Sequence, residues 1–300
     1  MRKLNTIIIA FILYFGHPTF AQAITSEFSA LYFRPAVGER DFVFTHGTRQ
    51  LETRQWRAFS FFHYGRQPIE RTQSGNRVTG IIDHLFVQEI GGAYALTDWW
   101  QTELGLPLIW INEFTRPVTP APSSKIKTGI GDLMFKNRFV VWDSNKHFIG
   151  ISLIPFVTFP TGNEYHFASD HKSTGGFLIA IDKDLSDKFF TGINIGLEGR
   201  EKTVFDDLIL DSRLILSGGL AYKPTTRWAF KGDVLALSPV TRLFTNKVST
   251  TTEAFLDISH QFKKSGFKTN VGGGLPLVQG AGVPDFRAFL GVSYTHIKNR

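Results

Sequence analysis

The feature that constrains this chain most is a pair of alternating apolar runs within residues 129–159, separated by the polar residues 143–146. In the second run Ile151, Leu153 and Val157 share one face. Period-two alternation on both sides of a short polar turn predicts an antiparallel hairpin. Each run has about ten residues or more, which is enough to cross a bilayer at a tilt.

The same pattern recurs along the chain after residue 55. We find about twelve alternating runs, at approximately 56–66, 79–96, 100–112, 129–142, 147–159, 174–184, 188–199, 208–222, 227–237, 250–262, 267–274 and 285–297. Short polar connections at 97–98, 143–146, 186–187, 223–226 and 263–266 alternate with longer ones at 67–78, 113–128, 160–173, 200–207, 238–249 and 275–284. Short turns at one end and long loops at the other are typical of bacterial outer-membrane barrels, with the short turns periplasmic.

The predicted fold class is therefore all-β: a membrane-spanning antiparallel β-barrel of about twelve strands, preceded by a cleaved signal peptide. A secreted sandwich or solenoid is the soluble alternative, but neither has a reason to keep the alternation of turn lengths. An apolar content of 42% excludes wholesale disorder, and the absence of cysteine excludes disulfides and thiolate metal sites.

The amino terminus has the features of a secretory signal. Arg2 and Lys3 precede an apolar run over residues 4–15, and Ala21 and Ala23 fit a small-x-small cleavage site. The apolar run of about a dozen residues is short of the roughly twenty that a retained anchor helix needs. Loss of the two basic residues lowers the formal charge from +7 to +5, which is too mild and too evenly spread to indicate a nucleic-acid partner.

The expected organisation has three parts: a signal peptide over residues 1–23, an N-terminal periplasmic lead-in or lumen plug over 24–54, and an outer-membrane barrel over 55–300. The lead-in has short apolar clusters separated by Gly and Pro. We expect that it could fold into the lumen and narrow it.

Aromatic residues lie beside the short turns, which predicts a girdle at one membrane interface. The interface aromatics are Trp99, Trp100, Trp142, Tyr222, Trp228 and Tyr294.

Charged residues fall mainly on the face opposite the apolar one, which predicts a polar lumen of both signs. The residues expected to line it are Glu103, Asp132, Lys136, Arg138, Asp211, Arg213, Lys231, Asp233, Glu253, Asp257 and Arg287. His84 and Gln88 fall on the wrong face if Asp83 and Glu89 point inward, so we expect a bulge or an edge of the apolar band there.

Several short motifs resemble a known group. GIGDL at residues 129–133, PTG at 160–162, FRP at 33–35 and IDHL at 82–85 resemble the N-terminal barrel domain of outer membrane protein A-like proteins. The GxGDL and PTG landmarks also recur in related porin-like families, one of them associated with phenol degradation. The resemblance covers most of the mature chain and implies a barrel without implying a substrate. We expect the barrel domain only, with no peptidoglycan-binding domain.

One pattern indicates catalysis. His171 and Ser173 resemble the His-x-Ser-Asn-Gly of outer-membrane phospholipase A, where a serine beside its base performs acyl transfer on lipid. Thr174 replaces the Asn, and no third group that orients the histidine is identifiable. A polar loop is the simpler interpretation, and we expect no enzyme.

A metal site is the second chemical alternative. His166 and His171 lie in one long loop with Glu164 and Asp170, but no helix or cysteine supports a metal motif. We expect no metal and no cofactor.

The lumen charges leave two functional interpretations. If they line opposite walls, a narrow water-filled strip passes small solutes; if they pair across the interior, the lumen is closed. We expect a porin-like channel or transporter for small solutes in the bacterial outer membrane. The alternatives are a closed structural barrel whose long loops meet partners, and a lipid acyl hydrolase. The expected contacts are membrane lipids, lipopolysaccharide and small solutes, with the oligomeric state open.

Overall fold

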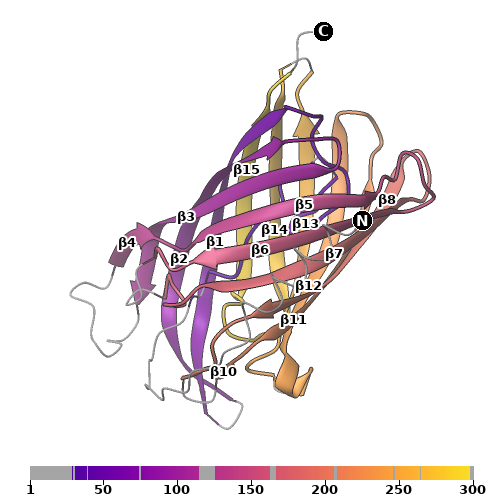
Figure 1. Cartoon of the computed structure of the whole chain (residues 1–300). Coiled ribbons are helices and arrows are strands. Elements are labelled where there is room, and N and C mark those ends of the chain that lie inside the picture. The colour runs from indigo at the N-terminus through magenta and orange to yellow at the C-terminus, as the bar shows by residue number, and fades with distance from the viewer. Residues whose placement is uncertain are drawn as a thin grey trace.

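The computed structural model describes residues 29, 31–38, 40–73, 76–114, 126–162, 167–205, 208–245, 247–263 and 265–297. These residues form a closed antiparallel barrel, with the carboxyl terminus at the end that carries the short turns (Figure 1). The strands are β1 (Trp56–Gln73), β2 (Asn76–Ala95), β3 (Trp100–Phe114), β4 (Ile126–Ile130), β5 (Leu133–Trp142), β6 (Gly150–Phe159), β7 (Thr174–Asp184), β8 (Phe189–Gly199), β9 (Thr203–Phe205), β10 (Leu208–Leu210), β11 (Arg213–Tyr222), β12 (Trp228–Pro239), β13 (Thr251–Gln261), β14 (Phe267–Val278) and β15 (Phe286–Thr295), with a 3-10 turn η2 (Val240–Arg242).

Twelve strands make up the wall. The main sheet contains thirteen strands, of which β4 and β5 count as one wall strand because both pair with β3 and only Gly131 and Asp132 separate them. The ring closes because β1 pairs with both β2 and β15, and β2 pairs with β3. A closed ring has no unpaired edge, as a sheet surrounded by lipid requires. The predicted all-β antiparallel barrel is confirmed, and the predicted signal peptide at residues 1–23 lies outside the described residues.

The two faces of the wall have opposite chemistry, as β8 illustrates. Ile193, Ile195 and Leu197 are 52%, 49% and 43% exposed, whereas the alternating Asn194 and Glu198 are buried. Large apolar side chains on the outside and polar ones inside invert the arrangement of a soluble sandwich and match a lipid-facing wall.

The connections differ from prediction in length. The turn between β5 and β6 runs over residues 143–149, because Asp143 accepts backbone hydrogen bonds from Lys146 and His147, both at 3.0 Å, and β6 begins only at Gly150. On the other side, β14 continues to Val278, so the loop predicted at 275–284 shrinks to 279–285. The alternation of short and long connections is therefore less strict than the sequence indicated.

The long loop predicted at residues 67–78 is wrong. Strands β1 and β2 instead continue to Gln73 and Asn76, in a two-stranded extension beyond the rest of the wall. Irregularities in the register occur between Arg66 and Ile69 and again between Arg71 and Thr72. The two strands pair with each other and need no further neighbour to continue.

The single strand predicted at residues 208–222 is also divided. Residues 208–210 pair with β9 in a small separate hairpin, and the wall strand β11 begins at Arg213. Asp211 consequently lies in the turn between them, where its carboxylate accepts hydrogen bonds from the backbone N–H of Ser212 at 2.7 Å and the Thr241 hydroxyl at 3.3 Å.

The bulge expected near His84 and Gln88 is confirmed, since the β2–β3 register shifts between Ile82 and His84 and again after Phe86. Both polar side chains are bonded within the wall: His84 Nδ1 lies 2.6 Å from the Tyr64 hydroxyl, and the Gln88 amide bonds the Ser60 hydroxyl at 2.8 Å. Across the part of the chain that the structure describes, no helix is long and apolar enough to cross a membrane.

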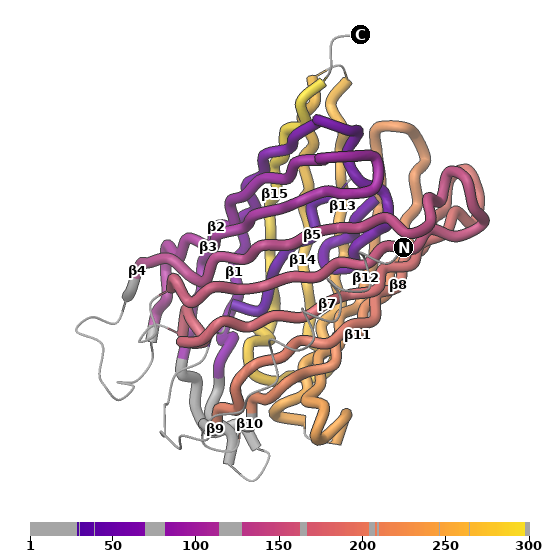
Figure 2. The backbone as a smooth tube through the Cα atoms, viewed as in Figure 1, coloured from indigo at the N-terminus to yellow at the C-terminus, as the bar shows by residue number. Residues whose placement is uncertain are grey.

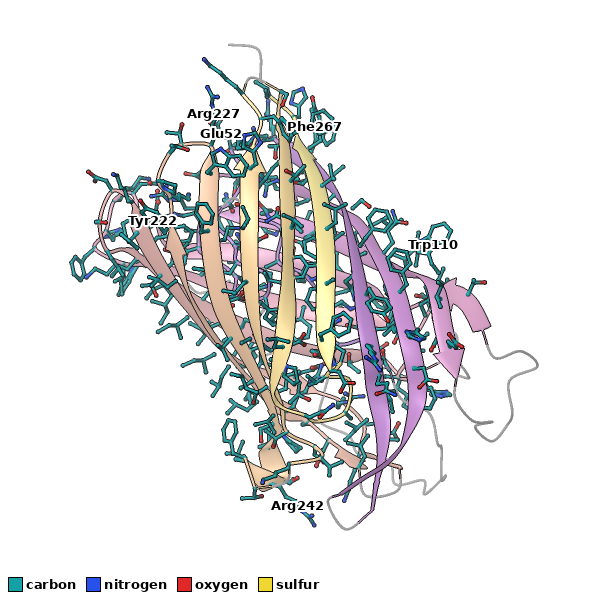
Figure 3. All side chains as sticks on the ribbon, turned by 180° about the vertical axis from the view of Figure 1, so that it is seen from behind. Glu52, Trp110, Tyr222, Arg227, Arg242 and Phe267 are labelled. Carbon is teal, nitrogen blue, oxygen red and sulfur yellow. The ribbon has the colours of Figure 1, made fainter. Side chains whose placement is uncertain are left out.

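Aromatic side chains gather at the short-turn end. Trp99 stacks on Trp100 with ring centroids 6.2 Å apart, and Tyr222 stacks on Phe189 at 4.8 Å. Figure 3 shows Tyr222 and Phe267 towards this end, with Arg242 at the opposite one. The side chains of Trp142 and Trp228 are exposed, at 49% and 44%, and Tyr294 packs on Phe267.

Candidate functional site

The described part of residues 31–54 has no strand and lies inside the barrel, where Figure 2 shows it as the indigo tube within the outline of the wall. Phe33 is 1% exposed and is the apolar anchor of this segment. Its ring centroid lies 6.0 Å from that of Phe61, 5.7 Å from Phe255 and 6.3 Å from Phe289, which come from β1, β13 and β15. We call residues 31–54 the interior segment.

A buried charged cluster lies next to this aromatic contact. Arg287 Nε donates to Glu253 Oε1 at 2.9 Å, and the Tyr32 hydroxyl donates to the other oxygen of the same carboxylate. The Arg287 guanidinium also stacks 4.3 Å from the centre of the Phe33 ring. Two wall strands thus hold two consecutive residues of the interior segment, one by charge and one by aromatic packing.

Wall side chains replace the missing sheet partners of the interior segment. Asp233 on β12 accepts backbone N–H bonds from Val43, Phe44 and Thr45 at 3.3, 2.8 and 3.0 Å. Asn194 on β8 accepts from the His46 N–H at 2.7 Å. Buried backbone N–H groups require such acceptors, and these polar side chains supply them without a β-ladder.

Three further bonds extend the same pattern. The Asn194 amide donates to the His46 carbonyl at 2.8 Å, so that one side chain satisfies both backbone groups of one residue. Asp182 on β7 accepts from both the N–H and the hydroxyl of Thr48, at 2.9 and 2.7 Å.

Asp41 is the charged centre of the interior segment. Both of its oxygens bond the Arg138 guanidinium of β5, at 3.1 and 3.0 Å, and Lys231 Nζ donates to its backbone carbonyl at 2.9 Å. Burial raises the pKa of Asp41, but Arg138, the His46 ring and the Gly47 N–H outweigh it and hold the pKa well below the ordinary value. The carboxylate is ionised, and its pairing fixes the segment against β5.

His46 lies in the same cluster. Its Nδ1 is 3.4 Å from an Asp41 oxygen and 3.2 Å from a terminal nitrogen of Arg138. Burial lowers the pKa of His46, and Lys136 and Arg138 lower it further, whereas Asp41 only partly restores it. The ring is therefore neutral at neutral pH, with Nδ1 able to accept from Arg138.

The structure places most of the residues predicted to line the lumen in this interior. Those that are buried are Glu103, Asp132, Lys136, Arg138, Lys231, Asp233, Glu253, Asp257 and Arg287. Several pair with each other: Lys136 lies 2.6 Å from Glu103, and Lys231 lies 3.2 Å from Asp257. Arg213 is partly exposed and pairs with Glu198, and Asp211 lies at the rim outside the wall strands. Their role in lining a pore stays a prediction.

The sequence motifs at 129–133 and 160–162 meet in space. The Thr161 hydroxyl donates to the Gly131 carbonyl at 3.1 Å, and Asp132 Oδ1 accepts from the Gly162 N–H at 3.0 Å. A Cβ on Gly162 would lie 2.5 Å from the Ala168 carbonyl oxygen, so this close approach requires glycine. The two motifs join the break between β4 and β5 to the loop that follows β6, which gives them a structural role.

Sequence reasoning missed the uncharged residues that hold the interior segment. Asn194 is the clearest case, and Gln101, whose side-chain oxygen accepts from the Leu51 N–H at 2.9 Å, is a second. Alternation alone places Asn194 inside, since it lies between Ile193 and Ile195 on β8. The residues predicted to line the lumen are all charged, and Asn194 and Gln101 carry no charge.

A cavity remains between the interior segment and the wall. It offers about 80 Å³ to the centres of water molecules and is bordered by the interior segment on one side and by strands β5 to β8, β11 and β12 on the other. Its lining combines apolar side chains with the charged groups Arg34, Asp132, Lys136, Asp170, Glu198, Arg200 and Arg213. Concave sites with an apolar wall and a few converging polar groups are where small ligands bind.

The two chemical alternatives gain no support. His166 and Glu164 lie outside the described residues, and the residues that the structure does describe contain no group of three or more His, Asp and Glu suited to a metal ion. Ser173 is exposed in the loop before β7, and His171 has a left-handed backbone with φ of 61°.

No family model and no curated relative matches the chain. Among solved structures, it is similar to the COG4313 outer membrane channel from Pseudomonas putida F1, with a TM-score of 0.62 at 13% sequence identity over 83% of this chain and 98% of that one. It is also similar to the NanC porin, with a TM-score of 0.53 at 8% identity over 80% of this chain and 98% of that one. At these identities the likeness shows a shared fold, that of a porin-like membrane barrel.

Proposed function

We propose that this chain is a porin-like channel for small solutes in the bacterial outer membrane, and that the interior segment is a plug that narrows its lumen. The observation that carries the proposal is the cavity beside this segment, which has room for several waters, since the buried polar interior is not packed solid. Twelve strands enclose more room than an eight-stranded barrel filled by side chains. The two similar solved structures are an outer membrane channel and a porin, which supports this function.

The orientation follows from the turns. We place the short-turn end, where the carboxyl terminus and the Leu51 end of the interior segment lie, on the periplasmic side. The aromatic girdle then contacts the inner leaflet, and the longer loops face outward, where lipopolysaccharide is the expected lipid partner. Assignment to the outer membrane protein A-like group rests on the motifs at 129–133 and 160–162 and stays a prediction.

Single-channel recording in planar bilayers tests this function. The full mature chain is expected to give small ion-conducting steps, and deletion of residues 31–50 to enlarge them several-fold because the interior segment then no longer fills the lumen. Heat-modifiable migration on a gel verifies that both proteins fold as barrels. Larger steps without the segment support a plugged channel, and equal steps contradict the plug.

A closed structural barrel is the second candidate, and the density of bonds to the interior segment favours it. Asp41, Asp182, Asn194 and Asp233 each make at least two of these bonds. Silence of both proteins in the bilayer would support this candidate and move the function to the outer loops. We assign no enzymatic activity, and any lipid hydrolysis that survives Ser173→Ala would not be that of the predicted serine.

A further inference from the structure

The cavity beside the interior segment has two chemically distinct walls. One wall is apolar. It is lined by Leu31 and Phe44 of the interior segment and by Phe156, Leu178 and Ile215 of the barrel. At about 10–15 Å³ per water centre, the cavity has room for roughly five to eight waters, or the bulk of a small ring compound.

The second wall carries arginines with unused hydrogen-bond donors. Arg200 is only 4% exposed and pairs with Asp170 through one terminal nitrogen. Its Nε is buried and finds no acceptor among the described residues. This Nε has almost no accessible surface and is therefore closed to the cavity. The donor that Arg200 has left for a ligand is the terminal nitrogen that does not bond Asp170, since within the described ranges no partner is found for it.

Arg213 adds a second guanidinium beside it. Arg213 and Glu198 face each other across β11 and β8, and the pair is formed through Arg213 Nε. Within the described ranges, no other partner is found for the two terminal nitrogens of Arg213, and its side chain is 20% exposed towards the cavity that it lines. Two arginines therefore present donors to the same space.

The acidic residues of this wall already have donors. Asp132 accepts from the N–H groups of Gly162 and Asp170, at 3.0 and 3.1 Å. Asp170 accepts from the Ser29 N–H at 2.9 Å and from Arg200, and Glu198 accepts from Arg213. Among the described residues, the hydrogen-bonding groups of the cavity that remain without a partner are thus mainly donors. A ligand therefore has to supply acceptors.

We propose that this cavity binds a small organic acid, with its carboxylate on Arg200 and Arg213 and its aromatic or short aliphatic body on the apolar wall. Guanidinium groups bond carboxylates through paired N–H donors, which selects a planar carboxylate over a neutral polar group. This proposal deepens the proposed channel function, on which it rests, by naming a class of solute that would pause beside the plug.

Calorimetric titration of the refolded full-length mature chain in detergent micelles tests the site. The probes are sodium benzoate, benzyl alcohol and benzylammonium chloride, which share a ring and differ in the head group. Benzoate is expected to bind at least about tenfold more tightly than the other two, in keeping with one charge-assisted contact. Equal affinity for benzoate and benzyl alcohol, or no heat with any probe, would overturn the proposal.

Variants locate the binding. Arg200→Gln is expected to weaken benzoate binding about tenfold, the effect of losing one charge-assisted hydrogen bond. Arg200→Lys keeps the charge beside Asp170 but lacks the second terminal nitrogen, and is expected to weaken benzoate binding similarly. Arg227→Gln is the matched control, since Figure 3 shows Arg227 at the short-turn end with Glu52 and Phe267. Unchanged affinity in both Arg200 variants would refute the site.

The titration needs no conductance, so the two proposals fail separately. A chain that binds benzoate through Arg200 and yet gives no steps in a bilayer retains the site and loses the channel. A chain that conducts without binding benzoate retains the channel and loses the site.

Discussion

Asp233→Asn removes one charge from the barrel wall and is expected to loosen the interior segment. The carboxylate accepts three backbone N–H bonds, of which those from Phe44 and Thr45 share one oxygen at 2.8 and 3.0 Å. In the variant, the side-chain carbonyl oxygen of Asn can take the place of that carboxylate oxygen and accept the same two bonds. The bond from Val43, at 3.3 Å to the other oxygen, is already long.

The magnitude follows from the change of acceptor. A hydrogen bond to a charged acceptor contributes about 1.5–3 kcal/mol and a neutral one about 0.5–1.5 kcal/mol, so each of the two good bonds loses about 1 kcal/mol. The total of about 2 kcal/mol corresponds to a roughly thirtyfold larger fraction of molecules with a released segment.

Hydrogen exchange measures this release directly. Peptides that cover residues 43–45 are expected to exchange about thirtyfold faster in Asp233→Asn, in line with the free energy above. Peptides from β13 and β14 should be unchanged. Asp187→Asn, in the exposed turn between β7 and β8, is the matched control. If exchange at residues 43–45 is the same in both variants, the carboxylate does not hold the segment and the reasoning is refuted.

Three other perturbations probe the same structure. Because the folded chain lowers the pKa of His46 and favours its neutral form, docking of the interior segment is complete above the ordinary histidine pKa of about 6.5 and weakens as the pH falls below it. The fraction of molecules open at residues 43–48, obtained by dividing the exchange rate by the intrinsic amide rate at each pH, should rise between about pH 7 and pH 5, and His46→Gln should abolish that rise. Gly162→Ala places a Cβ 2.5 Å from a carbonyl oxygen and should destabilise the barrel by about 1–3 kcal/mol in heat-modifiability gels, whereas Gly218→Ala, whose nearest atom is 3.7 Å away, should not. Leu256, 74% exposed on β13, faces lipid, so Leu256→Arg should reduce refolding into vesicles by about 2–4 kcal/mol; unchanged refolding would place this face out of the bilayer.

Much of the barrel wall could be predicted, because its strands follow from the local sequence. Period-two alternation depends only on neighbouring residues, so the runs around β5, β6 and β8 were identified with errors of a few residues. The prediction of strand ends failed at two segments that form strand pairs which the alternation does not indicate. Residues 67–78 pair with each other beyond the wall, and residues 208–210 pair with β9, and neither event is visible in hydrophobicity alone.

The candidate site was predicted only in part for the same reason. Alternation indicates that Asp233 and Arg138 point inward, because the orientation of a side chain on a strand follows from its position. It does not indicate their partners, since Asp233 bonds residues 188–190 positions away in the chain. The uncharged Asn194 carries no signal beyond its place between two isoleucines.

The sequence by itself determined a closed, twelve-stranded wall with an apolar outside and a charged inside, because those properties repeat every two residues along each strand. Only the tertiary structure decided what fills that wall. The interior segment has no alternation of its own, and its path is fixed by Phe33 among three distant aromatic rings and by Asp41 on Arg138. The cavity exists only because this segment and the wall do not fill the interior completely.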